Sequence, residues 1–335
     1  MKRPVLLPLV PLYMAGLALR EVRLNRGWEP IRRLQNPVIS IGNLSTGGAG
    51  KTPLTIELAR LLSARGFHVD VLSRGYGRSS REPARVQPEG TAAQYGDEPL
   101  LIAREACVPV YVAAERYDAG LLAESNIFRD EGSPQIHILD DGFQHRQLHR
   151  DIDILLVNRE DWHDDLLPAG NLRETLNGAR RASALAIPAE DSVFEAELRD
   201  WGWTGPVWRL RRRMEIPHVP GPIIAFCGIA RPEQFFAGLE AAGVDIADRV
   251  AFRDHFSYRK ADLNDLVDAA TLPGSGVSAL ITTEKDMIRL GSLTSALPDH
   301  LPLLTVRLAI DIDDESQVSD WLVDRLRTRQ TAQSL

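Results

Sequence analysis

A glycine-rich loop that ends in lysine and threonine is the part of this sequence most directly suited to chemistry. The run VISIGNLSTGGAGKT, residues 38–52, begins with β-branched residues and is followed by Pro53. Glycines let backbone N–H groups surround phosphate oxygens, and a helix that starts here points its positive end at the same anion. In such a loop the lysine reaches the β and γ phosphates and the threonine ligates magnesium. We therefore predict a nucleotide site formed by Ser45, Thr46, Gly47, Gly48, Ala49, Gly50, Lys51 and Thr52.

The loop departs from the general P-loop pattern GxxxxGKS/T at its first position. The pattern places glycine at position 45, where this chain has Ser45. A chance Gly-Lys-Thr sequence in a loop is the alternative interpretation. The order of strand, loop and helix favours the nucleotide site.

Acidic residues supply the other groups that phosphoryl transfer requires. Asp140 and Asp141 follow the apolar segment 136–139, and a carboxylate at the end of a strand holds magnesium in P-loop proteins, directly or through water. Transfer to an alcohol also needs a carboxylate that accepts the hydroxyl proton. Asp97 and Glu98, in the sequence GDEP, are the candidates, although Asp97 could instead cap a helix.

One histidine and three arginines complete the set of candidate residues. His255 follows an expected strand and could orient an aspartate across a cleft, or it could be a structural histidine. Arg74, Arg116 and Arg173 each follow an expected strand, and arginine is the usual side chain that stabilises phosphoryl charge. Each could alternatively form a surface ion pair, which contributes little to stability.

Short apolar segments bounded by turns alternate with helical periodicity along most of the chain. This alternation predicts an α/β fold, with a P-loop NTPase-like parallel sheet covered by helices. Ligands bind beyond the carboxyl ends of strands in such sheets, so the candidate residues would share one rim. The expected strands are 38–41, 69–72, 108–112, 136–139, 152–157, 184–187, 223–227, 249–252, 279–283 and 303–308, and the expected helices are 54–64, 98–106, 232–242 and 260–270.

A chain of 335 residues is long enough for about two domains. We predict a membrane-associating segment at 1–30, a P-loop domain at 31–195, a connection at 196–222 that could contain a strand pair, and a smaller α/β domain at 223–335. The arginine-rich run 209–213 could contact phosphate or lipid, but a solvated strand face is the simpler interpretation. Two isolated cysteines, Cys107 and Cys227, indicate a reducing compartment and no structural zinc.

Charge is distributed unevenly. The net charge of −7 argues against broad nucleic-acid binding, yet residues 1–36 carry seven basic and two acidic side chains, a net charge of +5. Between Arg3 and Arg20 lie 16 uncharged residues, fewer than the ~20 that a spanning helix needs. We predict that this segment lies in a membrane surface with its arginines on anionic headgroups. A signal peptide and a helix packed on the protein's own core are the alternatives.

Eight segments in order resemble the tetraacyldisaccharide 4′-kinases of lipid A biosynthesis, and they cover nearly the full chain. Serine at position 45 matches the loop of that family, so the departure from the general pattern does not weaken this resemblance. The segments are IGNLSTGGAGKTP from Ile41, SRGYGR from Ser73, GDEP from Gly96, LDDGFQH from Leu139, LLPAGNLRE from Leu166, AFCGIARPEQF from Ala225, DHFSY from Asp254 and TTEKD from Thr282.

The resemblance implies transfer of the ATP γ-phosphoryl group to the 4′ hydroxyl of a tetraacylated glucosamine disaccharide 1-phosphate, at the cytoplasmic face of the inner membrane. It implies a lipid substrate, a membrane surface and Mg²⁺, with no nucleic-acid or protein partner. Asp97 would be the base and His255 its partner, and their placement in different domains predicts closure during turnover. Thr52, Asp140 and Glu98 would surround magnesium, Arg74, Arg116, Arg173 and Glu174 would face the sugar headgroup, and Thr283, Lys285 and Asp286 would lie near the nucleotide.

Two other functions are compatible with a P-loop. GTPases and ATPases of the metal-chaperone or partitioning type have a similar loop, but the partitioning enzymes place lysine where this chain has Thr46. Guanine recognition usually needs NKxD, whereas Lys285 and Asp286 are adjacent here. A membrane-associated nucleotide-binding regulator without catalysis would keep the loop and the basic N-terminus but would not need Asp97.

Overall fold

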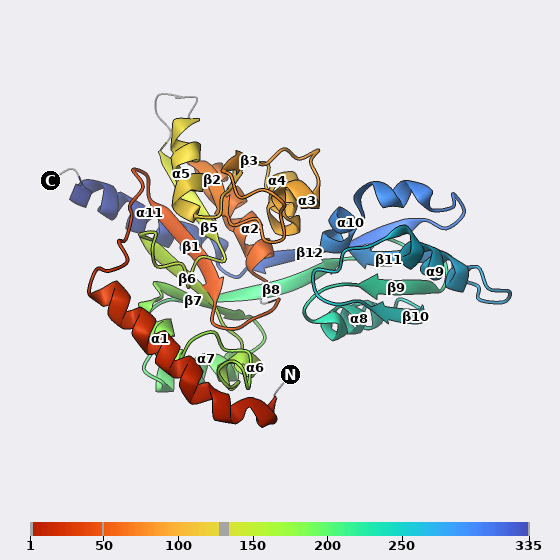
Figure 1. The fold of residues 1–335 in the computed structure, drawn as a ribbon, viewed down its shortest axis with the longest axis horizontal. Helices are drawn as coiled ribbons and strands as arrows, with labels where there is room; N and C mark the ends of the chain where they lie inside the picture. Colours follow the sequence, from red (N-terminus) through yellow and green to blue (C-terminus); the bar gives the residue numbers. More distant parts are fainter. Residues whose placement is uncertain (1–2, 49, 127–133, 334–335) are drawn as a thin grey trace.

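Twelve strands form one continuous sheet in the computed structural model, which describes residues 3–48, 50–126 and 134–333 (Figure 1). Their order is β10-β9-β11-β12-β8-β7-β6-β1-β5-β2-β4-β3, and only the pairs β8–β12 and β3–β4 are antiparallel. The strands are β1 Val38–Asn43, β2 His68–Ser73, β3 Ala84–Arg85, β4 Val110–Val112, β5 Gln135–Asp140, β6 Ile152–Leu156, β7 Ala184–Pro188, β8 Val207–Glu215, β9 Ile223–Cys227, β10 Ile246–Ala251, β11 Ala279–Thr283 and β12 Leu303–Ile312.

Helices connect most of the parallel strands, and the predicted α/β fold with a large parallel sheet is confirmed. Every strand expected from the sequence is present, with ends that differ by a few residues. The α-helices are α1 Val10–Asn25, α2 Lys51–Ala64, α3 Ala92–Tyr95, α4 Asp97–Glu105, α5 Arg116–Ser125, α6 Arg159–Trp162, α7 Ser192–Asp200, α8 Pro232–Ala241, α9 Lys260–Ala270, α10 Glu284–Leu290 and α11 Glu315–Gln333, and the 3₁₀ helices are η1 Pro4–Leu9, η2 Leu176–Arg181 and η3 Gly291–Ala296.

The long antiparallel pair β8–β12 joins two parts of the molecule, which we call the P-loop half (β1–β7) and the C-terminal half (β9–β11) (Figure 1). The beginning of β8 pairs in parallel with β7, and its later residues pair with the end of β12. The beginning of β12 pairs in parallel with β11. The strands of each half therefore point their carboxyl ends toward the other half, which is where ligands bind in parallel sheets.

The core of the P-loop half forms around β1, which is buried along its whole length and pairs with β5 and β6 on its two edges. Helix α2 packs its apolar side, including Leu54 and Leu58, on this sheet. Helix α11 returns from the C-terminal half, and its buried residues Val318 and Leu322 join the same core cluster. We propose that α11 belongs functionally with the P-loop half and that the β8–β12 pair serves as the interdomain connection.

The N-terminal segment forms a helix on the outside of the P-loop half (Figure 1). The 22-residue stretch Pro4–Asn25 has a mean hydropathy of 1.6 in its most apolar window, and none of that window is buried, so by length and composition alone it could cross a membrane. The helix continues past Arg20, which makes it longer than the uncharged run. Its exposed apolar side chains do not fit a helix packed on the protein's own core, and they include Val5, Leu7, Leu9, Leu12, Met14, Leu19 and Val22.

Candidate active site

The glycine-rich loop lies between the end of β1 and the start of α2, at the rim that faces the C-terminal half. Gly47 and Gly50 have φ values of +102° and +89°, a left-handed conformation that favours glycine. Lys51 Nζ donates to Asn43 Oδ1 at 3.1 Å and lies 3.5 Å from Asp141 Oδ1. Ala49, another predicted nucleotide ligand, lies outside the described residues. The loop is thus arranged as a phosphate-binding loop with its lysine held at the rim.

The first residues of the loop bond to the protein itself. Ser45 is buried, and its hydroxyl donates to Asp161 Oδ2 at 2.7 Å while it accepts from Asn43 Nδ2 at 3.1 Å. The backbone N–H of Thr46 donates to the carbonyl of Asn171 at 2.8 Å. Both residues were predicted to bind nucleotide. In the structure, both hold the start of the loop against the segment that follows β6.

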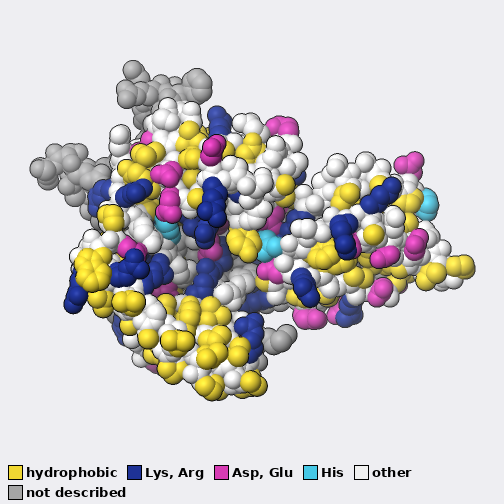
Figure 2. All heavy atoms as spheres, in the orientation of Figure 1, with side chains coloured by type: hydrophobic (Ala, Val, Ile, Leu, Met, Phe, Trp, Pro, Cys, Tyr) yellow, Lys and Arg dark blue, Asp and Glu magenta, His cyan; other side chains and the backbone are white. Residues whose placement is uncertain are grey.

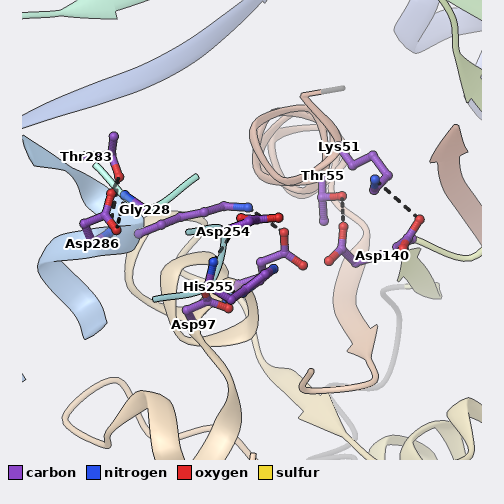
Figure 3. A network of polar contacts seen from close by, with 12 residues as sticks. Lys51, Thr55, Asp97, Asp140, Gly228, Asp254, His255, Thr283 and Asp286 are labelled. Atoms are coloured by element: carbon purple, nitrogen blue, oxygen red, sulfur yellow. Dashed lines mark hydrogen bonds and ion pairs between the residues drawn. The ribbon is translucent and has the colours of Figure 1, made fainter. Parts of the chain in front are cut away.

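Asp140 ends β5 beside the loop and is buried. It accepts from Thr55 Oγ1 at 3.1 Å, a contact visible in Figure 3. Burial raises the pKa of Asp140 to about 7, and the charges of Glu98 and Asp141 act in the same direction. A bound cation would relieve this repulsion, so the residues fit Mg²⁺ in their chemistry.

No set of three His, Cys, Asp or Glu side chains in metal-binding geometry occurs among the described residues. Mg²⁺ commonly takes one or two carboxylates and completes its shell with water and substrate phosphates. Asp140, Glu98 and the buried Thr52 supply groups of this kind at the rim. The observed arrangement therefore suits a metal that arrives with the nucleotide.

Asp97 and His255 come together from the two halves (Figure 3). Asp97 begins α4, where its Oδ1 accepts from the Glu98 backbone N–H at 2.9 Å, and His255 lies in the loop after β10. The distance from His255 Nδ1 to Asp97 Oδ2 is 3.1 Å. Burial opposes ionisation of Asp97, but His255, Arg289 and Lys285 outweigh it and lower the pKa of this carboxyl, while the bond to Asp97 raises the pKa of His255. These cations therefore keep Asp97 in its ionised carboxylate form despite its burial.

A second pair of side chains crosses between the halves next to the first. Lys285 on α10 contacts Glu98 Oε1, and this lysine lowers the pKa of Glu98. Thr283 caps α10 and bonds to Asp286, which is buried and accepts from the Gly228 backbone N–H. Of the three residues expected near the nucleotide, Lys285 reaches the rim of the P-loop half, whereas Thr283 and Asp286 organise the C-terminal half.

Arg173 connects the loop, the acidic pair and the segment after β6. Its Nε donates to the Ser45 carbonyl at 2.8 Å, and its Nη2 donates to Asn43 Oδ1 at 2.9 Å. It also forms an ion pair with Asp141 at 3.2 Å. Glu174 accepts from Gln144 Nε2 at 2.8 Å and from Arg181 Nη2 at 2.7 Å. Both predicted headgroup residues are thus held at the rim by protein contacts.

Arg74 and Arg116 lie near each other at the carboxyl ends of β2 and β4. Arg116 Nη2 donates to the Asp141 carbonyl at 3.3 Å, and its buried Nε has no hydrogen-bond partner in the described part of the chain. Burial lowers the pKa of His145 to about 3, with further contributions from Arg116, Arg150, Arg20 and Arg74. This concentration of positive charge suits an anionic group. Figure 2 shows Lys and Arg side chains gathered in the hollow between the two halves.

Positive φ angles occur at two non-glycine residues of the site, Asp141 at +47° and His255 at +55°. Aspartate and histidine tolerate this conformation better than most residues, and such backbone strain clusters at functional sites.

The arginine-rich run 209–213 lies on β8, and its side chains divide between the two faces of that strand. Arg209, Arg211 and Arg213 form exposed ion pairs, whereas Arg212 lies against Gly50 and bonds to Gln234.

Sequence reasoning missed several residues that hold the site together. Asn43 bonds to both Lys51 and Arg173, and Thr55 bonds to Asp140. Arg289 contacts Asp97 from α10. The available signals were weak: Asn43 is a polar residue directly after a buried strand, and Arg289 lies one helical turn after Lys285.

The assembled groups can perform phosphoryl transfer to an acceptor. One rim holds a phosphate-binding loop, a buried carboxylate with a raised pKa, several arginines and an aspartate–histidine pair. These are the groups needed to position a nucleotide, neutralise its charge and accept a hydroxyl proton. The two halves face each other across this rim and would exclude water from the reacting groups.

Comparison with known proteins points to one family. Residues 2–327 match the family model described as tetraacyldisaccharide-1-P 4′-kinase. The chain is 39% identical to a tetraacyldisaccharide 4′-kinase of Koribacter versatilis, with 96% of this chain and 99% of that protein covered. It is 38% identical to the Geobacter sulfurreducens enzyme of the same name, with 89% and 88% covered. The crystal structure of Aquifex aeolicus LpxK in complex with ATP is similar with a TM-score of 0.73 at 33% identity, covering 96% of this chain and 98% of that chain.

Proposed function

We propose that this chain, which belongs to the tetraacyldisaccharide-1-P 4′-kinase family and is a kinase of lipid A biosynthesis, transfers the γ-phosphoryl group of ATP to the 4′ hydroxyl of tetraacylated glucosamine disaccharide 1-phosphate. The observation that carries this proposal is the meeting of Asp97 and His255 beside the P-loop, because nucleotide binding alone would not require a base. The ATP complex of the Aquifex aeolicus relative supports ATP as the donor.

Magnesium would be held by Thr52, Asp140 and Glu98. When bound, the ion supplies positive charge to the β and γ phosphates. The raised pKa of Asp140 supports this assignment, because carboxylates that repel one another favour a cation between them. Lys285 now contacts Glu98, and its ammonium group would have to leave that carboxylate before a metal could use it.

The residues of the chain have separate tasks in the reaction. Lys51 and the backbone of the glycine-rich loop bind and orient the phosphates. Arg116 and Arg173 stabilise the charge of the transferred group and of the sugar headgroup, with Arg74 and Glu174 beside them. Asp97 accepts the proton of the 4′ hydroxyl. The 4′ oxygen forms a bond to the γ phosphorus, and the bond from that phosphorus to the ADP oxygen breaks. His255 orients Asp97.

Closure of the C-terminal half on the P-loop half would bring these groups together. Asp97 and His255 belong to different halves, and the β8–β12 pair is their shared connection. Closure would exclude water and so favour transfer to the lipid over hydrolysis.

The N-terminal helix would place the enzyme at the cytoplasmic face of the inner membrane, either peripherally or shallowly inserted. Figure 2 shows hydrophobic side chains gathered over the part of the surface where Figure 1 places α1. The helix is also fastened to the site, since Tyr13 Oη donates to the Arg173 carbonyl at 2.8 Å and Arg20 contacts the Gln144 carbonyl. A lipid whose acyl chains remain in the bilayer would thus reach the rim beside α1.

Incubation with γ-labelled ATP and the tetraacyl disaccharide 1-phosphate in detergent micelles tests this function. We expect label in a bisphosphorylated lipid, with the new phosphate located at the 4′ position by mass spectrometry and NMR, and dependence on Mg²⁺. A Lys51→Met variant serves as the control for contaminating kinases. Release of labelled phosphate to water without any labelled lipid would refute the proposal and favour an ATPase.

A further inference from the structure

Arg289 occupies the junction between the two halves and contacts both. Its side chain is 6% exposed and extends from α10 toward α4. Nη1 donates to Asp286 Oδ1 at 3.0 Å and to the Gly228 carbonyl, which fixes the guanidinium within the C-terminal half. Nε donates to Asp97 Oδ2 at 2.6 Å, and Nη2 also contacts that oxygen. Nη1 of the guanidinium therefore bonds within the C-terminal half, while Nε and Nη2 contact Asp97 of the P-loop half.

The hydrogen bonds of Asp97 distinguish its two carboxylate oxygens. Oδ2 receives Nε of Arg289 at 2.6 Å and Nδ1 of His255 at 3.1 Å, which together account for both of its lone pairs. Within the described part of the chain, Oδ1 receives one hydrogen bond, from the Glu98 backbone N–H. Oδ1 therefore retains a lone pair for a proton, and Oδ2 does not.

We propose that Arg289 is a positioning residue, which together with His255 holds Oδ2 of Asp97 so that Oδ1 is the atom that accepts the proton of the substrate hydroxyl. The proposal rests on the proposed role of Asp97 as the base. It assigns to α10 a task in the reaction, in addition to its packing in the C-terminal half.

A purely structural role does not account for the geometry. Arg289 already has a buried carboxylate partner in its own half, Asp286. The contact with Asp97 adds a second carboxylate from the opposite half, directly at the residue that would do the chemistry. Planar guanidinium can hold both partners at once through different edges, which a lysine cannot do.

The charged groups around Asp97 give the proposal a measurable signature in the kinetics, because Arg289 and His255 are the ones that hold Oδ2. Those that face it are His255 from the loop after β10, Lys285 and Arg289 from α10, and Glu98 from α4. Removing Arg289 would take away one of the two side-chain donors that hold Oδ2, so Oδ1 would no longer be held in place for the substrate hydroxyl. Such a loss lowers kcat and leaves the KM for ATP little changed, because the nucleotide is bound by other residues.

Kinetics of Arg289→Met and Arg289→Lys test the proposal, with Arg259→Met as the matched control because Arg259 is exposed and pairs with Asp262 away from the site. We expect Arg289→Met to lower kcat roughly 100-fold, with the KM for ATP changed less than about threefold. Arg289→Lys should lower kcat about tenfold, because a single ammonium cannot span both carboxylates.

Wild-type kcat in Arg289→Met, or a rise in its KM for ATP as large as its loss of kcat, would overturn the positioning role. If that variant proves unfolded in a thermal melt, Arg289→Lys decides, and wild-type kcat in the lysine variant would overturn it equally. Asp97→Asn is measured in parallel. Retained turnover in Asp97→Asn would mean that the proposed base is wrong, whereas loss of turnover there with wild-type kcat in the Arg289 variants would mean that the positioning role alone is wrong.

Discussion

Asp97 Oδ2 lies 3.1 Å from Nδ1 of His255, although 157 residues of sequence separate them and they belong to opposite halves of the molecule. The contact exists because the β8–β12 pair turns the carboxyl ends of both sets of parallel strands toward each other. Phosphoryl transfer would therefore depend on a bond that forms only when the two halves meet.

Replacement of His255 by alanine tests that dependence. We expect kcat for lipid phosphorylation to fall roughly 10- to 100-fold, because Asp97 loses the partner that orients it, while nucleotide affinity stays near the wild-type value. His300→Ala is the matched control, since His300 is exposed in the C-terminal half. Steady-state kinetics and nucleotide titration provide the measurements. Wild-type turnover in His255→Ala would rule out a mechanism that uses both halves.

Asp140 should make the metal-free protein less stable as the pH rises. Burial and the nearby carboxylates raise the pKa of Asp140 to about 7 in the folded state, from about 3.9 in the unfolded chain. The folded state therefore binds the proton more tightly, so stability is greatest below the unfolded pKa and is lost as the pH rises through about 7.

Asp140→Asn removes this loss. At pH 8 we expect the variant to be more stable than the wild type by about 1 to 4 kcal/mol in the absence of Mg²⁺, with the difference disappearing near pH 4. Added Mg²⁺ should stabilise the wild type at pH 8 and have little effect on the variant. Thermal melts across pH, with exposed Asp299→Asn as the control, measure both effects. A stability difference that grows toward acidic pH would contradict the raised pKa.

Ser45 should matter more for stability than for nucleotide binding. Its buried hydroxyl bonds to Asp161 and Asn43, away from the phosphate-binding backbone. Ser45→Ala should lower the free energy of unfolding by about 1 to 3 kcal/mol, because a buried carboxylate loses a donor. The KM for ATP should change less than about threefold. Chemical denaturation and steady-state kinetics measure the two effects, and Ser295→Ala, at an exposed serine, is the control. A large rise in the KM for ATP with an unchanged free energy of unfolding would show that Ser45 binds the nucleotide.

The sequence predicts the parallel sheet well because each buried strand carries its own apolar, β-branched pattern. The β8–β12 pair was not predicted in detail. Arginines on β8 make it resemble a solvated segment, and its partner lies about 90 residues later, so pairing and register depend on tertiary contacts. The inward-facing arrangement of the two halves follows from this pair and could not be read from local patterns.

The candidate site shows the same division between local and tertiary information. Lys51, Thr52 and Asp140 carry recognisable local context, a glycine-rich loop or a strand end, and they meet at one rim. Arg289 carries no such context, because its significance comes entirely from the proximity of α10 to α4. Asn43 likewise gains its role only once Arg173 is brought beside it.

The exposed apolar residues of the N-terminal helix should mediate membrane binding. Val5 is 87% exposed and Leu12 is 74% exposed. The double variant Val5→Asp and Leu12→Asp should bind vesicles containing anionic lipid at least tenfold more weakly, since charged residues resist insertion. Leu272→Asp, at an exposed leucine in the C-terminal half, is the control. Sedimentation with vesicles measures binding, and equal sedimentation of all three proteins would remove the helix from this role.

Phosphoryl transfer by Asp97→Asn decides whether Asp97 is the base, measured with γ-labelled ATP and the tetraacyl disaccharide 1-phosphate while nucleotide binding is titrated on the same preparation. Because the amide cannot accept the hydroxyl proton but keeps the size of the side chain, we predict that lipid labelling falls by about 100-fold or more with nucleotide affinity retained. Lipid labelling at the wild-type rate would contradict the assignment of Asp97 as the base and with it the proposed two-half site.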